Sequence, residues 1–298
     1  MNGFLFIDKE KGCTSFDVIR ALKSGKKIPG KKVKIGHSGT LDPIATGLMI
    51  IALGEATKLL EFLLGADKVY RATCEFGAVS DTYDADGKIE KVSRAKKVSL
   101  DAIKKIVKEK FTGEIEQMPP KYSAKKVAGK RACDLMREGK EFELKSKKVN
   151  IFDFVFVSFE WPRMEFEVSC SSGTYVRSLV HDLGQELKCG AYMTGLRRME
   201  IGFLDGGRRR GFSVDNALRV GEDPKILHSI EEVFEKFPTI LLNVNDYNKL
   251  KNGGFVLSTK SIQKGGVLAK YEGKIVGVLE SIRDGKFVKF RKKINISA

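Results

Sequence analysis

The stretch from residue 33 to residue 54 reads VKIGHSGTLDPIATGLMIIALG, and its only formally charged side chains are Lys34 and Asp42. The acid lies in a Gly-rich loop, an apolar run follows at 48–53, and residues 55–64 have the pattern of a helix. Glycines allow the tight backbone and close ligand approach of a functional loop, and the proline after the acid stiffens it. Asp42 is therefore a candidate catalytic residue. The alternative is that it caps a turn or helix, as Asp before Pro often does.

The segment before this stretch predicts a strand and a helix. Residues 3–7 form an apolar run typical of a buried strand, and 9–14 read as a turn. Ser15 is a plausible helix N-cap. The helix that follows has apolar side chains at helical spacing, namely Phe16, Ile19 and Leu22.

The segments after this stretch continue with strands and helices. Residues 69–78 have strand character, 80–87 form a polar turn, and 99–111 have one apolar helical face. Residues 151–170 read as two strands around Trp-Pro-Arg, which predicts an antiparallel hairpin. A Ser-Ser-Gly-Thr turn then begins a helix with a core face made of Leu179, Val180, Leu183 and Leu187.

The charge balance points to a polyanionic partner. The 298 residues carry 54 Lys and Arg against 38 Asp and Glu, a net charge of +16. A protein this basic attracts nucleic acid through its long-range field and through counterion release. A heat-adapted, ion-pair-rich surface is the alternative, but acids and bases would then rise together.

The length allows one large domain with a smaller second one. We expect the boundary between 237 and 238, because residues 238–298 contain short β-rich segments, frequent glycines and few helical patterns. This C-terminal part holds 12 Lys or Arg and 4 Asp or Glu, which is half of the net charge in a fifth of the length. Residues 119–148 are also basic and poor in apolar side chains, so they predict an exposed insertion, either a solvated loop or one that contacts RNA.

Several classes of protein are not indicated. The five cysteines are far apart and include no C-x-x-C pair, so neither a disulfide framework nor a zinc site is expected. Metal-protease, P-loop and dinucleotide signatures do not occur, so no metal and no cofactor is predicted. No apolar run reaches the ~18 residues of a membrane span, which predicts a soluble, cytoplasmic protein.

A carboxylate that acts as a nucleophile must stay ionised, and a nearby Arg lowers an Asp pKa by about 1–3 units. Arg177 is the best partner for Asp42, because it lies in the first turn of a predicted helix, where a cation gains nothing from the helix dipole. A surface Arg is the alternative. His37 reads as a loop histidine and His181 as structural or exposed. A thiol nucleophile at Cys170 is not favoured, since nothing local would activate it.

Seven motifs together resemble the TruB family, the bacterial tRNA pseudouridine synthases that act on the uridine at position 55 in the T arm. They occur in order through the first 202 residues: KEKGCTS (9–15), GHSGTLDPIATG (36–47), GEATK (54–58), KVYRATCEFGAVSDTYDADG (68–87), PPKYSAKKVAGKRA (119–132), CSSGTYVRSLVHDLGQELKCGA (170–191) and LRRMEIG (196–202). The resemblance implies an α+β catalytic domain with a mixed, mainly antiparallel sheet flanked by helices and loops. It also implies that the basic C-terminal part is a small β-rich PUA domain that binds RNA.

The resemblance implies roles for individual residues. Asp42 would be the catalytic aspartate, Arg177 its partner, and Tyr70 the tyrosine that packs on the target base. The remaining positions would contact the substrate or form the pocket: His37, Gly39, Thr40, Tyr175 and Leu196. The substrate would be the T-arm stem-loop of tRNA, with the target uridine flipped out of its stack. The protein would act as a monomer without a cofactor.

Two positions depart from the family pattern, with Glu10 where Pro is usual and Ser38 where Thr is common. The three arginines of DGGRRRGFSV, Arg208 to Arg210, receive no assignment beyond a phosphate contact. Two alternatives stay open at this point. One is the catalytic subunit of a guide-RNA-dependent pseudouridylation complex, and the other is a non-catalytic RNA-binding or RNA-folding protein.

Overall fold

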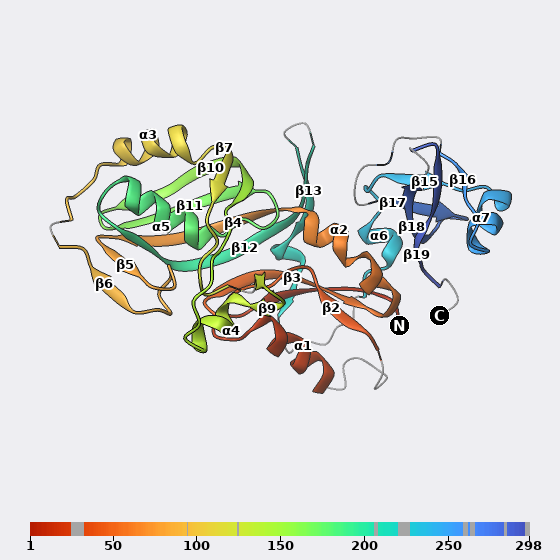
Figure 1. The fold of residues 1–298 in the computed structure, drawn as a ribbon, viewed down its shortest axis with the longest axis horizontal. Helices are drawn as coiled ribbons and strands as arrows, with labels where there is room; N and C mark the ends of the chain where they lie inside the picture. Colours follow the sequence, from red (N-terminus) through yellow and green to blue (C-terminus); the bar gives the residue numbers. More distant parts are fainter. Residues whose placement is uncertain are drawn as a thin grey trace.

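The computed structural model describes residues 1–24, 33–93, 95–123, 125–205, 208–219, 227–258, 262, 266–282 and 285–295. Figure 1 shows a large body built on one twisted sheet and a smaller C-terminal body built on a second sheet. The side chains of Arg208, Arg209 and Arg210 lie outside the described part, so their assignment is not addressed by the structure.

Within the described residues, ten strands form the large sheet: β1 (Gly3–Lys9), β2 (Ile35–His37), β3 (Ala45–Leu53), β4 (Asp67–Phe76), β7 (Gly113–Gln117), β10 (Lys147–Glu160), β11 (Arg163–Cys170), β12 (Ala191–Asp205), β13 (Arg208–Ser213) and β14 (Leu218–Arg219). Their order is β14-β1-β3-β12-β4-β11-β10-β7, with β13 beside β12 and β2 beside β3. Two of the pairs are parallel, β1 with β14 and β12 with β3. The sheet is therefore mixed and mainly antiparallel.

The helices of this body are α1 (Ser15–Ser24), the 3-10 helix η1 (Gly54–Leu59), α2 (Leu60–Gly65), α3 (Leu100–Lys110), α4 (Ala132–Arg137), α5 (Val176–Glu186), the 3-10 helix η2 (Val214–Asn216) and α6 (Ile230–Val233). Two hairpins lie outside the large sheet, β5 (Ala78–Ser80) with β6 (Ile89–Lys91) and β8 (Lys126–Val127) with β9 (Lys130–Arg131).

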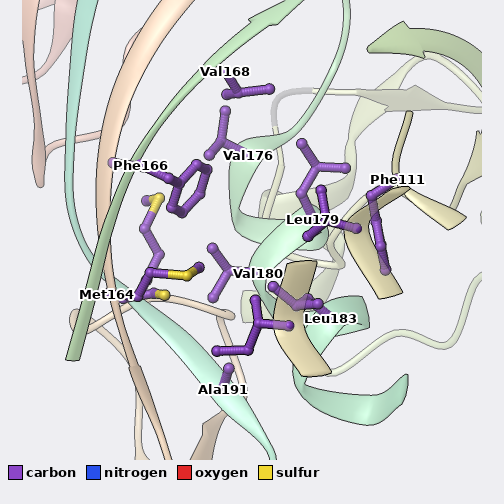
Figure 2. Close-up of a cluster of buried hydrophobic side chains, with 14 of the residues drawn as sticks. Phe111, Met164, Phe166, Val168, Val176, Leu179, Val180, Leu183 and Ala191 are labelled. Carbon is purple, nitrogen blue, oxygen red and sulfur yellow. The ribbon is translucent and has the colours of Figure 1, made fainter. Parts of the chain in front are cut away.

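Helix α5 packs on the large sheet through the apolar face that its sequence predicts. Leu179, Val180 and Leu183 are buried with residues of β11 such as Phe166, and Figure 2 shows this cluster. Helix α3 joins the cluster through Ile103 and Val107. Because α5 is anchored along this face, the residues of its first turn are held at a fixed place beside the sheet.

The region around α1 and η1 differs from the sequence prediction in three ways. Ser15 is the first residue of α1 and not its N-cap, and its hydroxyl bonds to the backbone of Leu41 instead. Phe16 is 62% exposed, because the buried face of α1 is formed by Val18, Ile19 and Leu22. The helix predicted at 55–64 begins as a 3-10 helix and becomes an α-helix only from residue 60.

The basic insertion at 119–148 is mostly exposed, as predicted, but it is not only a loop. It contains the hairpin β8–β9 and helix α4. Ala132 and Leu135 of α4 are buried, so the helix has a small apolar contact of its own. Short helices with two apolar contacts leave little periodicity in a sequence, which explains why α4 was missed.

The C-terminal residues form a separate sheet in the order β15-β17-β18-β19-β16 among the described residues. Its elements are β15 (Thr239–Leu241), α7 (Val244–Lys251), β16 (Val256–Leu257), β17 (Val267–Tyr271), β18 (Lys274–Ile282) and β19 (Phe287–Lys293). Helix α7 was not predicted. Among the described helices, none has the length and apolar composition needed to cross a membrane.

The two bodies share a hydrophobic cluster. Phe4 of β1 and Phe234 lie in it together with Leu268 of β17 and Ile275 and Val278 of β18. Figure 1 shows α2 and α6 between the two sheets, and α6 contacts both β1 and β18. The C-terminal sheet is thus fixed against the large body by apolar packing.

Candidate active site

Asp42 lies in the loop between β2 and β3, and the side chain of Ser15 holds the backbone of this loop. The Ser15 hydroxyl accepts a hydrogen bond from the Leu41 amide at 2.8 Å and donates one to the Leu41 carbonyl at 3.2 Å. Gly39 has φ +128°, a conformation that side chains with a Cβ rarely adopt. The Gly-rich sequence therefore serves a loop that holds Asp42 in one place.

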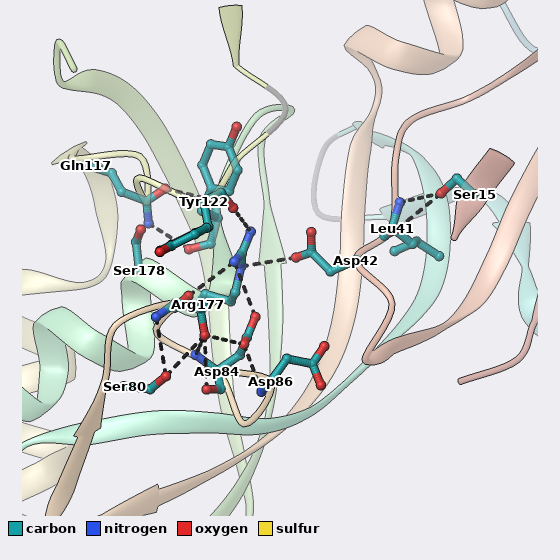
Figure 3. A network of polar contacts seen from close by, with 12 residues as sticks. Ser15, Leu41, Asp42, Ser80, Asp84, Asp86, Gln117, Tyr122, Arg177 and Ser178 are labelled. Carbon is teal, nitrogen blue, oxygen red and sulfur yellow. Dashed lines mark hydrogen bonds and ion pairs between the residues drawn. The ribbon is translucent and has the colours of Figure 1, made fainter. Parts of the chain in front are cut away.

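The first turn of α5 brings Arg177 to this loop, as Figure 3 shows. Arg177 Nε lies 3.0 Å from Asp42 Oδ2, an ion pair without the alignment of a hydrogen bond. The other end of the guanidinium binds Asp84 in the turn between β5 and β6, with Nη1 3.2 Å from Oδ2. Arg177 also donates to the carbonyls of Thr82 and Tyr122, both at 3.1 Å.

Burial raises the pKa of the Asp42 carboxyl above its usual range, although Arg177 and Lys9 act in the opposite direction. Asp84 adds to the rise because its negative charge repels that of an ionised Asp42. The Arg177 guanidinium lowers the Asp42 pKa, but not enough to reverse the net rise. Removal of the carboxylate from water outweighs the neighbouring cation.

Tyr70 of β4 lies beside Arg198, a cation that is 1% exposed. Arg198 donates from Nε to the Leu48 carbonyl at 2.6 Å and from Nη2 to the Gly39 carbonyl at 3.1 Å, and its charge acts on the Tyr70 phenol. Arg198 therefore links β12, β3, the Asp42 loop and Tyr70. Burial raises the pKa of the Tyr70 phenol, so its hydroxyl is protonated at neutral pH.

A cavity of about 500 Å³ joins these groups. Its lining includes most of the residues predicted from the sequence, namely Gly39, Thr40, Asp42, Tyr70, Tyr175, Arg177 and Leu196. His37 is not part of the lining. Its Nδ1 accepts a hydrogen bond from the Gly39 amide at 3.3 Å, and burial lowers the pKa of its imidazole.

Four buried charged residues at or beside the cavity were missed by the sequence analysis: Lys9, Lys68, Asp84 and Arg198. Lys68 donates to three carbonyls at the end of α2, those of Leu63, Leu64 and Ala66, and burial lowers its pKa to about 8. A signal for Arg198 was present, since neighbours on a strand point to opposite faces. Arg197 is partly exposed and pairs with Asp8 at 2.7 Å, while Arg198 is buried.

The thiol alternative has no support in the geometry. Cys170 is buried, and burial raises its pKa to about 12, so it remains a thiol at neutral pH. The His181 ring stacks on Tyr83. Among the described residues, no group of three or more His, Cys, Asp or Glu side chains could hold a metal ion.

Comparisons with known proteins show which family the chain resembles over most of its length. Residues 26–176 match the TruB family pseudouridylate synthase (N terminal domain). The chain is 38% identical to the tRNA pseudouridine synthase B of Aquifex aeolicus (strain VF5) over 94% of this chain and 96% of that protein. It is 36% identical to the protein of the same name from Clostridium tetani (strain Massachusetts / E88), over 97% and 99%.

A solved structure is similar over nearly the whole chain. The structure of an H/ACA RNP bound to a substrate RNA containing 2'-deoxyuridine matches with a TM-score of 0.70 at 20% identity, covering 98% of this chain and 85% of that one. The likeness confirms the predicted α+β fold class.

Proposed function

The chain belongs to the TruB family of pseudouridylate synthases, and from this premise we propose that it converts the uridine at position 55 in the T arm of tRNA to pseudouridine. As a tRNA pseudouridine synthase, the protein is an isomerase. The bond between ribose C1′ and uracil N1 breaks, the base turns, and C1′ bonds to C5. Substrate and product contain the same atoms, so the reaction needs no redox partner.

The placement of Asp42 carries the proposal. Its side chain is 34% exposed, next to a guanidinium that is almost completely buried, and it lines the same cavity as Tyr70. An ionised Asp42 either attacks ribose C1′ or assists elimination of the base. In both routes Arg177 stabilises the carboxylate, and Lys9 adds a second positive charge.

Tyr70 packs on the flipped uracil in this proposal. Taking a base out of its stack costs a few kcal/mol, and stacking on an aromatic side chain offsets about 1–3 kcal/mol of that cost. Arg198 fixes the phenol in place through its contact with Tyr70. A neutral phenol suits a stacking surface, and Tyr70 would need to lose its proton before it could act as a base.

The other lining residues have simpler roles. Leu196 and Tyr175 form walls of the pocket, and the backbone at Gly39 and Thr40 approaches the substrate. His37, next to this loop but outside the lining, contacts RNA beside the flipped nucleotide. Two lysines of the lining, Lys125 and Lys147, are placed to contact backbone phosphates.

The relatives favour the stand-alone tRNA enzyme over a guide-RNA-dependent subunit. The relatives at 36 and 38% identity bear the tRNA enzyme's name, whereas the likeness to the H/ACA RNP structure is at 20% identity. We propose that the protein acts as a cytoplasmic monomer on a bare T-arm stem-loop.

The test is release of tritium from C5-labelled uridine in a T-arm stem-loop, because forming the C5 glycoside expels that hydrogen. We expect release with the wild-type protein and none with Asp42→Asn. Binding of the stem-loop should stay within about twofold, since the amide keeps the shape of the carboxylate. No release by the wild type would favour a non-catalytic RNA-binding protein, and equal release by both proteins would remove Asp42 from the mechanism.

A further inference from the structure

Arg177 contacts the turn between β5 and β6 at two residues. Arg177 donates to the Thr82 carbonyl and pairs with the Asp84 carboxylate. Inside the turn, the Thr82 hydroxyl donates to Asp84 Oδ1 at 2.6 Å and the Asp86 amide donates to the same oxygen at 3.1 Å. Asp84 is thereby oriented toward α5.

Tyr83 lies between Thr82 and Asp84, the two residues that Arg177 contacts, and it has an uncommon backbone conformation. Its φ is +67°, in the left-handed region that favours Gly and Asn over residues with large side chains. Its carbonyl accepts a hydrogen bond from the Met193 amide at 3.0 Å, which ties the turn to β12. A bulky residue persists in this conformation only where its surroundings compensate for the strain.

The Tyr83 ring stacks on the His181 ring. The ring centroids are 3.8 Å apart and the planes differ by 14°. His181 lies four residues after Arg177, so α5 presents both side chains on one face. His181 Nδ1 is buried and has no hydrogen-bond partner among the described residues. Among the described residues, the contact that holds the His181 ring is therefore the stack on Tyr83 and not a hydrogen bond at Nδ1.

We propose that Tyr83 and His181 are positioning residues for the isomerisation, because their stack holds the turn so that Asp84 stays on Arg177 and Arg177 stays beside Asp42. Helix α5 then clamps the turn with a charged contact and an aromatic contact one helical turn apart. The proposal rests on the proposed function, since it concerns the ionised state of Asp42. It gives a role to a histidine that the sequence analysis read as structural or exposed.

Replacing the tyrosine by glycine separates positioning from strain. Tyr83→Gly relieves the left-handed backbone but removes the ring, so thermal stability should hold or rise while kcat falls on the order of tenfold to a hundredfold. KM should stay within about twofold, because the residue does not line the cavity. Tyr83→Phe keeps the ring and should retain wild-type kcat.

The matched control is Lys188→Gly. Lys188 is also left-handed, with φ +55°, and it is exposed beyond the end of α5. This variant relieves the same kind of strain without touching the stack. Its kcat should equal that of the wild type.

A second pair tests the other ring. His181→Ala removes the stack and should lower kcat as Tyr83→Gly does, whereas His181→Phe keeps it and should not. If Tyr83→Gly fails to fold, the positioning role is tested by comparing kcat of His181→Ala and His181→Phe, provided that the two variants have the same Tm.

The pH profile supplies a signature that general destabilisation would not produce. The charged groups around Asp42 are Arg177 of α5, Asp84 and Asp86 of the turn, and Lys9 of β1. When Asp84 moves away, Arg177 pairs with Asp42 alone. The pKa of Asp42 falls, because the repulsion from Asp84 is lost. The acid limb of kcat should then shift to lower pH in Tyr83→Gly and His181→Ala.

Three results would overturn the proposal. They are wild-type kcat in Tyr83→Gly, an equal loss in Tyr83→Phe, or a change in KM alone. Failure of the proposed function is distinguishable, because the wild-type protein would then release no tritium at all.

Discussion

The cavity around Asp42 and the C-terminal sheet hold charge in opposite ways. At or beside the cavity, Asp84, Arg177 and Arg198 are buried, and each contacts named partners at the distances given above. In the C-terminal body, Lys251 of α7, Lys274 of β18 and Lys293 of β19 are exposed around a second cavity of about 370 Å³. Burying a charge costs free energy of desolvation, but its partners then hold it in a defined position. An exposed charge has little desolvation cost and acts through a field that salt screens. The first arrangement suits chemistry and the second suits binding.

The largest expected effect follows from removing the buried cation. Arg177→Met removes the cation that Asp42 and Asp84 share, and breaking a buried pair costs about 3–5 kcal/mol of unfolding free energy. Urea unfolding would measure it. The control is Arg197→Met, which breaks the partly exposed pair with Asp8 and should cost about 0.2–1 kcal/mol. Equal losses would show that burial does not distinguish the two arginines.

An intermediate effect is expected on the C-terminal side. Changing Lys251, Lys274 and Lys293 together to Gln should weaken binding of tRNA roughly tenfold to a hundredfold at 0.15 M salt, if all three neutralise phosphates. The loss should shrink as salt rises, and kcat at saturating tRNA should not change. Filter binding over a salt series would measure it.

The control variant has the same net charge as the triple Lys-to-Gln variant, because it also loses three lysines. Gln at Lys104, Lys105 and Lys108 removes three exposed cations from α3, which Figure 1 places at the far end of the large body. If this variant loses as much affinity, the whole field attracts the RNA and the C-terminal sheet has no special part.

The smallest expected effect is a gain in stability. Burial raises the pKa of Asp42, so an ionised Asp42 disfavours the folded state. The stability that the wild type has below the ordinary Asp pKa is lost as pH rises through the raised, folded-state pKa. Asp42→Asn does not titrate, so its Tm should exceed that of the wild type at pH 7.5, and the difference should vanish toward pH 4. A lower Tm at pH 7.5 would contradict the sign of the shift.

The sequence predicted those parts of the site that local pattern controls. The lone acid in a Gly-rich loop indicated Asp42, and the apolar face of α5 fixed the helix that carries Arg177. The resemblance joined the two residues. Asp84 was not found, because its turn holds three acids and only the fold shows that Asp84 is buried while Asp81 and Asp86 are exposed. Net pKa was also beyond the sequence, because desolvation depends on the surrounding atoms.

The cluster shared by the two bodies has a consequence for protein engineering. A chain cut at the predicted boundary after residue 237 would lose Leu268, Ile275 and Val278, and Phe4 and Phe234 would face water. The cut would also remove Arg291, which binds Glu61 of α2 at 2.7 Å, and Leu64 of the same helix lines the Asp42 cavity. The C-terminal sheet is therefore not a detachable module that can be exchanged or fused elsewhere at will. A chain shortened to the large body would need polar residues in place of this apolar surface in order to stay soluble.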